Sequence, residues 1–521
     1  MSKTLTKTKH VLVRCWKEFS ENSSINALRY PFNGQLPKIE QFWWRKSIVS
    51  FLVAYCFVIV TLYFKWVMNP VVVTYTRTMH PLWELPFPAV TICPMTKVRV
   101  EEVNLTDVLV RVRRGETFDE YESMKLYTLS QVCPFMWMWY KQKTPANKTS
   151  SQVLQNMSLS INDLFLNCYW KNIKWPCYEI LAPTMTENGV CYTFNQISSD
   201  QLLRKENINL ESVVTNSWLP SDWNMETGYG DNAGVDSYPF RPLAKGYHSG
   251  LAIVLKTRQM DTEYLCEGPN KGFKVSIHPP DEYWTMSNRF FRLPFQQALL
   301  LTVDPKLTTI SQDLKKHHHT RRQCYFNDER YLKFFKIYNT NNCLFECFAN
   351  LTDSFCHCDQ ITRLRGLNTT VCVGELKDCP EIILHKQERS HQSLNGNEEW
   401  IGPCECLPAC AYVTYDVEVS RTPFNPHKLA RALFDTSDFY THSHDYALLA
   451  VGIKSKWMLP MKRCELMDYG DLMAQIGCLF GLMMGASVVS LVEILYFCLV
   501  RPLVQILKKS DTARPAIPWV K

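Results

Sequence analysis

The stretch GLMMGASVVSLVEILYF, residues 481–497, has the hydropathy of a membrane helix but contains features that lipid does not accept without compensation. Three small residues stand side by side at Gly485, Ala486 and Ser487, and a carboxylate follows at Glu493. Hydrocarbon tolerates neither an open backbone nor an unpaired charge, whereas both are permitted where they line water. A helix with one water-lined face would therefore accommodate this stretch.

Two segments are long and apolar enough to span a bilayer. The first is Ile48–Met68, whose twenty-one residues cover about 31 Å as a helix, the thickness of one hydrocarbon core. The second lies within 471–500; from Leu472 to Val500 a straight helix would be about 43 Å long, so it must be tilted or broken. The shorter apolar runs QALLLTV (297–303) and YALLAVG (446–452) indicate buried strands.

Charge predicts that both ends of the chain are cytosolic. Residues 1–47 carry nine Lys and Arg against three Asp and Glu, and the tail 501–521 is also basic. Because basic residues accumulate on the cytosolic side of membrane helices, residues 69–470 are predicted to be extracellular. The net charge of +7 lies mainly in the tails, so the large domain lacks the basic face that nucleic acid binding needs.

The central segment has two marks of an extracellular, oxidising compartment. It holds seventeen of the 21 cysteines, and disulfides persist only where thiols are not kept reduced. It also holds five N-x-S/T sequons, which we expect to be glycosylated: Asn104, Asn147, Asn156, Asn350 and Asn368. A sixth sequon, Asn22, lies in the predicted cytosolic tail and should stay unmodified.

Ten cysteines in the second half of the chain have a mirrored order. A CxxxC group near the start faces a CxCxxxC group at the end, which suits nested disulfides between two antiparallel segments. Spacing alone leaves the connectivity open. Zinc is the alternative interpretation, and an extracellular location favours disulfides over it. The ten are Cys324, Cys343, Cys347, Cys356, Cys358, Cys372, Cys379, Cys404, Cys406 and Cys410.

These features together resemble one known family. The chain is similar to the degenerin/epithelial sodium channel family, which includes the acid-sensing channels, and within it to the pickpocket-type branch. The resemblance rests on FPAVTIC (Phe87–Cys93), CYTFN (Cys191–Asn195), the ten-cysteine ladder, and the GAS triplet with its following glutamate. It covers nearly the whole chain.

The resemblance implies a trimer in which each subunit contributes two membrane helices and a large disulfide-rich α+β extracellular domain of the clenched-hand type. It also implies seven disulfides: Cys324–Cys410, Cys343–Cys406, Cys347–Cys404, Cys356–Cys379, Cys358–Cys372, Cys93–Cys191 and Cys168–Cys177. Cys133, Cys266 and Cys464 remain, and we favour a pair between Cys133 and Cys266. No cofactor, catalytic residue or metal site is expected.

The function that the resemblance implies is a sodium-selective, amiloride-sensitive cation channel of the plasma membrane, gated through its extracellular domain. The subunits would form a homotrimer, or a heterotrimer with related chains. Gly485, Ala486 and Ser487 would form the selectivity filter, because small side chains let three backbones approach the axis and offer oxygens to the ion.

Further pore positions follow from the same resemblance. Ala474 takes the position where bulky side chains hold related channels open, and Gly481 takes the position that contacts amiloride. Glu493 below the constriction, with Asp468 and Asp471 at the outer mouth, would concentrate cations.

Each of these residues also has a plainer interpretation. Small residues in membrane helices are commonly packing sites, and Gly477, Gly481 and Gly485 repeat every four residues. Glu493 could snorkel or pair with Arg501, about 12 Å along a helix. The run KKHHHTRR (315–322) is either a proton or metal sensor or a solvated basic loop.

Two departures from the family pattern bear on gating. Asn26-Ala27 stands where the family has a His-Gly pair before the first helix, which favours a heteromeric role. Tyr496 stands where acid-sensing channels have a further aspartate. The stimulus stays open among acid, peptide, small chemical, stretch and constitutive opening.

The rival functions are an ATP-gated trimeric cation receptor, a non-conducting two-helix receptor and a membrane-tethered enzyme. The sequence shows no lysine-rich ATP motif and no GxSxG or HExxH signature.

Overall fold

The computed structural model describes residues 19, 25, 30, 36–68, 71–140, 151–210, 220–221, 223–283, 285, 289–372, 376, 378–390, 404–428, 432, 443–501 and 504. The chain divides into two compact units, Val73–Arg463 and the combination of Met1–Val72 with Cys464–Lys521. The sequons at Asn22 and Asn147 and the Asn26-Ala27 pair lie outside the described residues.

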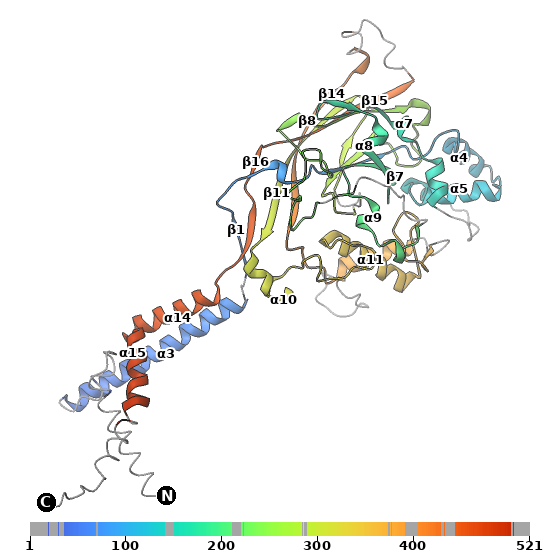
Figure 1. Cartoon of the computed structure of the whole chain (residues 1–521). Helices are drawn as coiled ribbons and strands as arrows, with labels where there is room; N and C mark the ends of the chain where they lie inside the picture. The colour runs from blue at the N-terminus through green and yellow to red at the C-terminus, as the bar shows by residue number, and fades with distance from the viewer. Residues whose placement is uncertain are drawn as a thin grey trace, which may run out of the picture. The chain divides into compact units, whose positions relative to one another are not determined.

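An eight-stranded sheet forms the centre of the larger unit (Figure 1). In neighbour order its strands are β1 (Val71–Tyr75), β17 (Met461–Glu465), β11 (Gln297–Ile310), β15 (His444–Ile453), β8 (Gly246–Arg258), β4 (Phe165–Trp170) and β5 (Ile173–Trp175), and β14 (Tyr412–Pro423) also pairs with β11. β11 pairs antiparallel with β14 and parallel with β15 and β17. Leu299, Leu301 and Val303 alternate into the core. The strands predicted from QALLLTV and YALLAVG are thus confirmed.

A five-stranded sheet brings two of the quoted sequence motifs together. Its strands, in order, are β10 (Phe291–Leu293), β9 (Phe273–His278), β3 (Ala89–Pro94), β7 (Gly189–Phe194) and β6 (Leu181–Thr186). FPAVTIC supplies β3 and CYTFN supplies β7, and the two strands are antiparallel neighbours, with Val90 opposite Phe194. Asn195 ends β7 in the left-handed conformation, at φ 61°, and its side-chain amide bonds the carbonyl of Phe87. An asparagine tolerates this backbone better than most residues.

Helices and loops surround the sheets in two clusters. One consists of α4 (Leu105–Arg113), α5 (Glu120–Ser130), η2 (Pro134–Met138) and α6 (Ser151–Met157). It has its own apolar core, which includes Leu126, Leu129, Met136 and Leu154. The other contains α11 (Thr340–Cys356) and α12 (Cys379–Ser390).

Eight disulfides join described residues of this unit. They are Cys93–Cys191, Cys133–Cys266, Cys168–Cys177, Cys324–Cys410, Cys343–Cys406, Cys347–Cys404, Cys356–Cys379 and Cys358–Cys372. The set contains the seven pairs that the resemblance implies and the pair that we favoured. Cys343 and Cys347 lie one helical turn apart on α11, so both side chains face the segment that carries Cys404 and Cys406.

Removal of one sulfur from this nested pair tests its contribution. Cys347→Ser opens a bridge between residues 57 apart in sequence, and such a bridge contributes about 2–4 kcal/mol, mostly by restricting the unfolded chain. We expect sharply lower surface expression and a Cys404 thiol that reacts with maleimide. The double variant with Cys404→Ser should be no worse, and Cys56→Ser on an exposed helix position should behave as wild type. An unreactive Cys404 in the single variant would contradict the pairing.

The basic run 315–322 is not simply a solvated loop, and that interpretation is wrong for its last residue. Arg322 is among the largest fully buried side chains, with 1% of its surface exposed. It pairs with Glu329, donates to the carbonyl of Cys324 over 3.2 Å, and lies over the ring of Phe326. Among the described residues no group of three His, Cys, Asp or Glu side chains could hold a metal ion.

Most of the described residues of the smaller unit lie in apolar helices. These helices are α3 (Lys38–Met68), α14 (Tyr469–Met484), α15 (Val488–Leu495) and the π-helical turn η8 (Tyr496–Val500). α14 lies alongside α3, where the indole of Trp66 donates to the carbonyl of Met467 over 3.1 Å and Tyr55 packs on Phe480.

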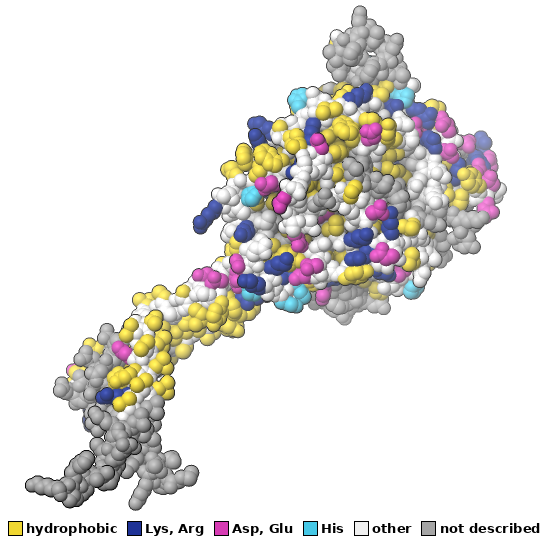
Figure 2. Space-filling view, in the orientation of Figure 1, with side chains coloured by type: hydrophobic (Ala, Val, Ile, Leu, Met, Phe, Trp, Pro, Cys, Tyr) yellow, Lys and Arg dark blue, Asp and Glu magenta, His cyan; other side chains and the backbone are white. Residues whose placement is uncertain are grey.

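Only α3 is, by itself, long and apolar enough to cross a membrane among the described helices. The second apolar segment passes the same test as a pair of helices with an 81° bend between them. No described residue of α3 is buried, and Figure 2 shows hydrophobic side chains over the visible face of these helices. Such a surface is the one that lipid would cover.

Candidate functional site

The candidate site is the break between α14 and α15. Gly485 ends α14 in the left-handed conformation, with φ 67° and ψ 23°, and its N–H donates to the carbonyl of Gly481 over 2.8 Å. Glycine adopts this backbone without the steric penalty that a Cβ brings. A Cβ built at Gly485 would meet no described atom within 4 Å, so the backbone conformation alone makes glycine the fitting residue.

Ser487 begins the next helix. Its backbone is extended, its N–H donates to the hydroxyl of Ser490 over 3.1 Å, and the two hydroxyls lie 3.4 Å apart. This reciprocal arrangement is a capping box, which satisfies backbone groups at the start of α15 that the helix itself leaves without partners. Our sequence reasoning missed Ser490, which is buried; the S-x-x-S spacing after the triplet was the available signal.

The last turn of α14 and the break form one local structure. A Cβ at Gly481 would lie 3.1 Å from the carbonyl oxygen of Ala486, so a glycine there gives this carbonyl room. A Cβ at Gly477 would meet nothing within 4 Å among the described atoms. Among the described residues of this chain, a Cβ at Gly477 or Gly485 thus has no neighbour, and packing of these glycines against other subunits stays a prediction.

The break brings together the carboxyl end of α14 and the amino end of α15, whose partial charges are opposite in sign. The carboxyl end of a helix carries a partial negative charge, because its last carbonyls have no intrahelical donors. α14 ends at the break, and Gly485 and Ser487 are exposed there. Backbone carbonyls with one hydroxyl are ligands that suit a hard, hydrated cation such as sodium.

The other predicted pore residues lie away from the break. Asp468 caps the start of α14 by accepting the N–H of Asp471 over 2.6 Å, and both aspartates are exposed. Asp468 thus has a structural role besides any effect on ions. Ala474 is exposed in the second turn of α14, and Glu493 is half-buried on α15.

Comparison with known proteins identifies the family. A family model described as amiloride-sensitive sodium channel matches residues 19–497. The chain belongs to the amiloride-sensitive sodium channel family. It is 23% identical over 499 residues to Pickpocket protein 28 of Drosophila melanogaster, covering 93% of this chain and 78% of that protein. It is 25% identical over 500 residues to sodium channel protein Nach of Drosophila ananassae, covering 93% and 86%.

A shorter match extends the likeness beyond insects. The chain is 24% identical over 261 residues to acid-sensing ion channel 4 of Mus musculus, covering 48% of this chain and 46% of that protein. The resemblance to the degenerin/epithelial sodium channel family is thereby confirmed. This amiloride-sensitive sodium channel family member is a membrane channel protein with a β-rich, disulfide-rich extracellular domain.

The capping box at the break can be tested directly. Ser490→Ala removes the acceptor of the Ser487 N–H, and loss of such a cap costs about 1 kcal/mol. We expect amide hydrogen exchange at 487–490 to be about fivefold faster in the detergent-purified protein, measured by mass spectrometry. Val489→Ala, at an exposed neighbour, is the matched control. Equal exchange in the Ser490→Ala variant and the wild type would show that the cap does not hold the break.

Proposed function

We propose that the chain is one subunit of a trimeric, sodium-selective cation channel whose pore is lined by α14, the break at 485–487 and α15. The observation that carries this proposal is the 81° break inside an otherwise apolar segment. Backbone that leaves its helix at membrane depth is stable only where protein or water satisfies it. The capping box satisfies part of it, and a water-filled pore would satisfy the exposed carbonyls.

The proposed filter consists of Gly485, Ala486 and Ser487. Three copies of such small side chains can meet at a three-fold axis, where they would leave a narrow opening lined by oxygen. The bond between Ser487 and Ser490 gives the filter hydroxyl a fixed partner, so the filter geometry depends on α15 as well. Glu493 would raise the cation concentration below the constriction, and Asp468 and Asp471 would do so at the outer mouth.

The proposed topology places residues 1–47 and 501–521 in the cytosol, spans at 48–68 and 471–500, and 69–470 outside the cell at the plasma membrane. The exposure of the sequons supports this topology. All four described sequon asparagines are exposed on the disulfide-bonded unit: Asn104, Asn156, Asn350 and Asn368. Glycans and disulfides require the same side of the membrane.

Gating through the extracellular domain follows from how the chain is connected. β1 comes directly after α3, and β17 comes directly before α14. β17 also pairs with β11, so a shift of the central sheet would pull on both membrane helices.

We place Ala474 at the gate and Gly481 at an amiloride contact. Ala474→Val should crowd the three-fold axis and raise basal current, and an unchanged basal current would remove Ala474 from the gate.

Substitutions of Ser487 test the filter. Ser487→Ala removes an oxygen at small volume, Ser487→Cys changes ligand softness, and Ser487→Asp adds a ring of three charges. We expect the sodium-to-potassium permeability ratio to change in this series, read as a shifted reversal potential in cells that express the chain with or without related subunits. Glu493→Gln should mainly lower conductance.

The matched control is Ser50→Ala, an exposed serine on α3. It should leave the reversal potential unchanged. Unshifted reversal potentials across the whole Ser487 series would contradict the filter assignment. An absence of current in every subunit combination would favour the non-conducting receptor.

A further inference from the structure

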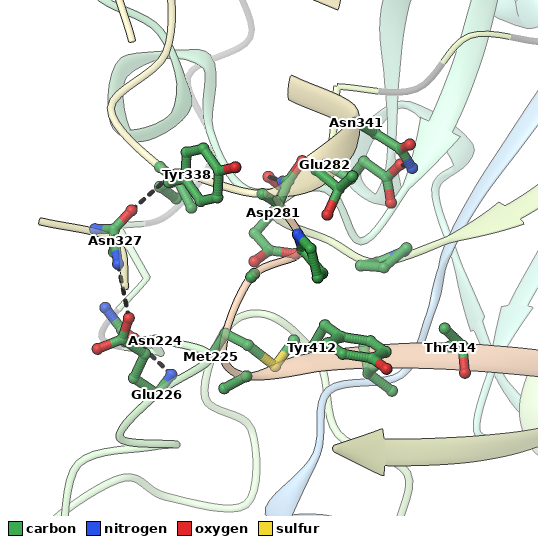
Figure 3. A pocket seen from close by; sticks show the side chains of 18 of the residues that line it. Asn224, Met225, Glu226, Asp281, Glu282, Asn327, Tyr338, Asn341, Tyr412 and Thr414 are labelled. Carbon is green, nitrogen blue, oxygen red and sulfur yellow. Dashed lines mark hydrogen bonds between the residues drawn. The ribbon is translucent and has the colours of Figure 1, made fainter. Parts of the chain in front are cut away.

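A cavity of about 400 Å³ lies in the Val73–Arg463 unit (Figure 3). Four chain segments meet around it: the loop at 223–226, the residues after β9, the approach to α11, and the start of β14. Its volume lies in the range of small-molecule binding sites. Nothing in the proposed channel function uses this cavity.

Aromatic side chains form much of its wall. They are Trp223, Tyr325, Tyr338, Tyr412 and Tyr415. Tyr415 is only 7% exposed, and its hydroxyl has no hydrogen-bond partner among the described residues. A buried hydroxyl without a partner is uncommon, because its desolvation is then uncompensated.

Two adjacent carboxylates lie on the opposite wall. Asp281 and Glu282 are each 5% exposed, and Figure 3 shows them across the cavity from Tyr412 and Thr414 of β14. Glu282 accepts a hydrogen bond from the side-chain amide of Asn341. No Lys, Arg or His of the described chain lies within ion-pair distance of either carboxylate, nor does a nearby positive charge lower either pKa.

The charges at the rim do not neutralise this pair. Glu226 and Arg289 both line the cavity but are exposed, so water screens the charge of each. Burial raises the pKa of Asp281 to about 6, and burial with the neighbouring aspartate raises the pKa of Glu282 well above its usual range. Ionising two buried acids without a counter-charge is costly, so both carboxyls hold their protons more tightly than usual.

A positively charged ligand would lower this cost, and the residues of the cavity wall indicate which class of cation fits. Cations bind the faces of aromatic rings, and aromatic walls combined with acids are the usual surroundings of bound ammonium groups. A metal ion fits less well, because calcium takes six to eight oxygen ligands and the described wall of the cavity supplies only two buried carboxylates.

We infer that this cavity binds a small organic cation, an amine or quaternary ammonium on an apolar body. The ammonium group lies against Asp281 and Glu282, the apolar body lies against Tyr412 and Trp223, and the Tyr415 hydroxyl donates to or accepts from a polar group of the ligand. This inference goes beyond the proposed function and does not depend on it, because binding requires no conduction.

The wall of the cavity includes residues of β14, a strand of the sheet through which we propose that gating acts. Tyr412 to Tyr415 belong to β14, which pairs with β11 over twelve consecutive residues. β11 in turn pairs with β17, the strand that precedes α14. A ligand that orders this end of β14 would therefore act on the strands that connect to the membrane helices.

Calorimetric titration of the full chain in lipid nanodiscs at pH 7.4 tests the inference. The probes are phenethylammonium and choline, and the uncharged match is 2-phenylethanol. We expect saturable binding of at least one cation, about tenfold or more tighter than 2-phenylethanol. The double variant Asp281→Asn with Glu282→Gln should weaken cation binding about tenfold or more. Tyr415→Phe should weaken it less.

The matched control is Asp359→Asn, since Asp359 is another buried acid whose pKa burial raises to about 6, but it lies outside the cavity. It should bind both cations as the wild type does. The inference is overturned if neither cation binds the wild type saturably, or if 2-phenylethanol binds as tightly as phenethylammonium. Equal binding by the double variant and the wild type would overturn it as well, as would displacement of both cations by calcium at equal concentration.

Discussion

The helix break at Gly485–Ser487 is the constraint on which the account of this membrane segment depends. A peptide backbone in hydrocarbon must satisfy its own hydrogen bonds, so a span cannot be interrupted without a reason. Here the sequence ends one helix with a residue that tolerates positive φ and starts the next with a serine that caps it. The same three residues have small side chains, and Gly485 and Ser487 are exposed. One short stretch thus satisfies part of the backbone and, in the proposed trimer, would form a polar, narrow site.

In the extracellular unit, two sheets and several loops must be held together in one folded domain. The long strand β11 pairs along most of its length with β14 and β15, and its end pairs with β17. Disulfides fix the helical parts where apolar cores are small, as between Cys133 and Cys266 beside α5. Because the first and last strands of this unit adjoin the apolar helices in sequence, the sheet would be the route by which an extracellular event reaches the proposed pore.

Sequence reasoning succeeded where the signal is local. Alternation of apolar residues predicted β11 and β15, and the length of the second apolar segment predicted its interruption. Sequence reasoning failed where a site joins residues that are distant in sequence, and where the environment of a side chain in the fold decides its role. Arg322 resembles its solvated neighbours but is buried on Glu329, and the capping role of Ser490 depends on the bend. The cavity that holds Asp281 and Tyr415 joins segments more than a hundred residues apart, so no local pattern reveals it.

The proposal that this chain is a subunit of a sodium-selective channel is tested most directly by recording current through planar bilayers. The bilayers contain either the purified chain alone or its complex with related subunits. A sodium gradient across the bilayer distinguishes a selective pore from a leak. We expect discrete currents whose reversal potential lies near the sodium equilibrium potential and shifts when sodium is replaced by potassium. Bilayers that contain correctly assembled protein yet remain silent, or currents that do not distinguish sodium from potassium, would contradict this proposal.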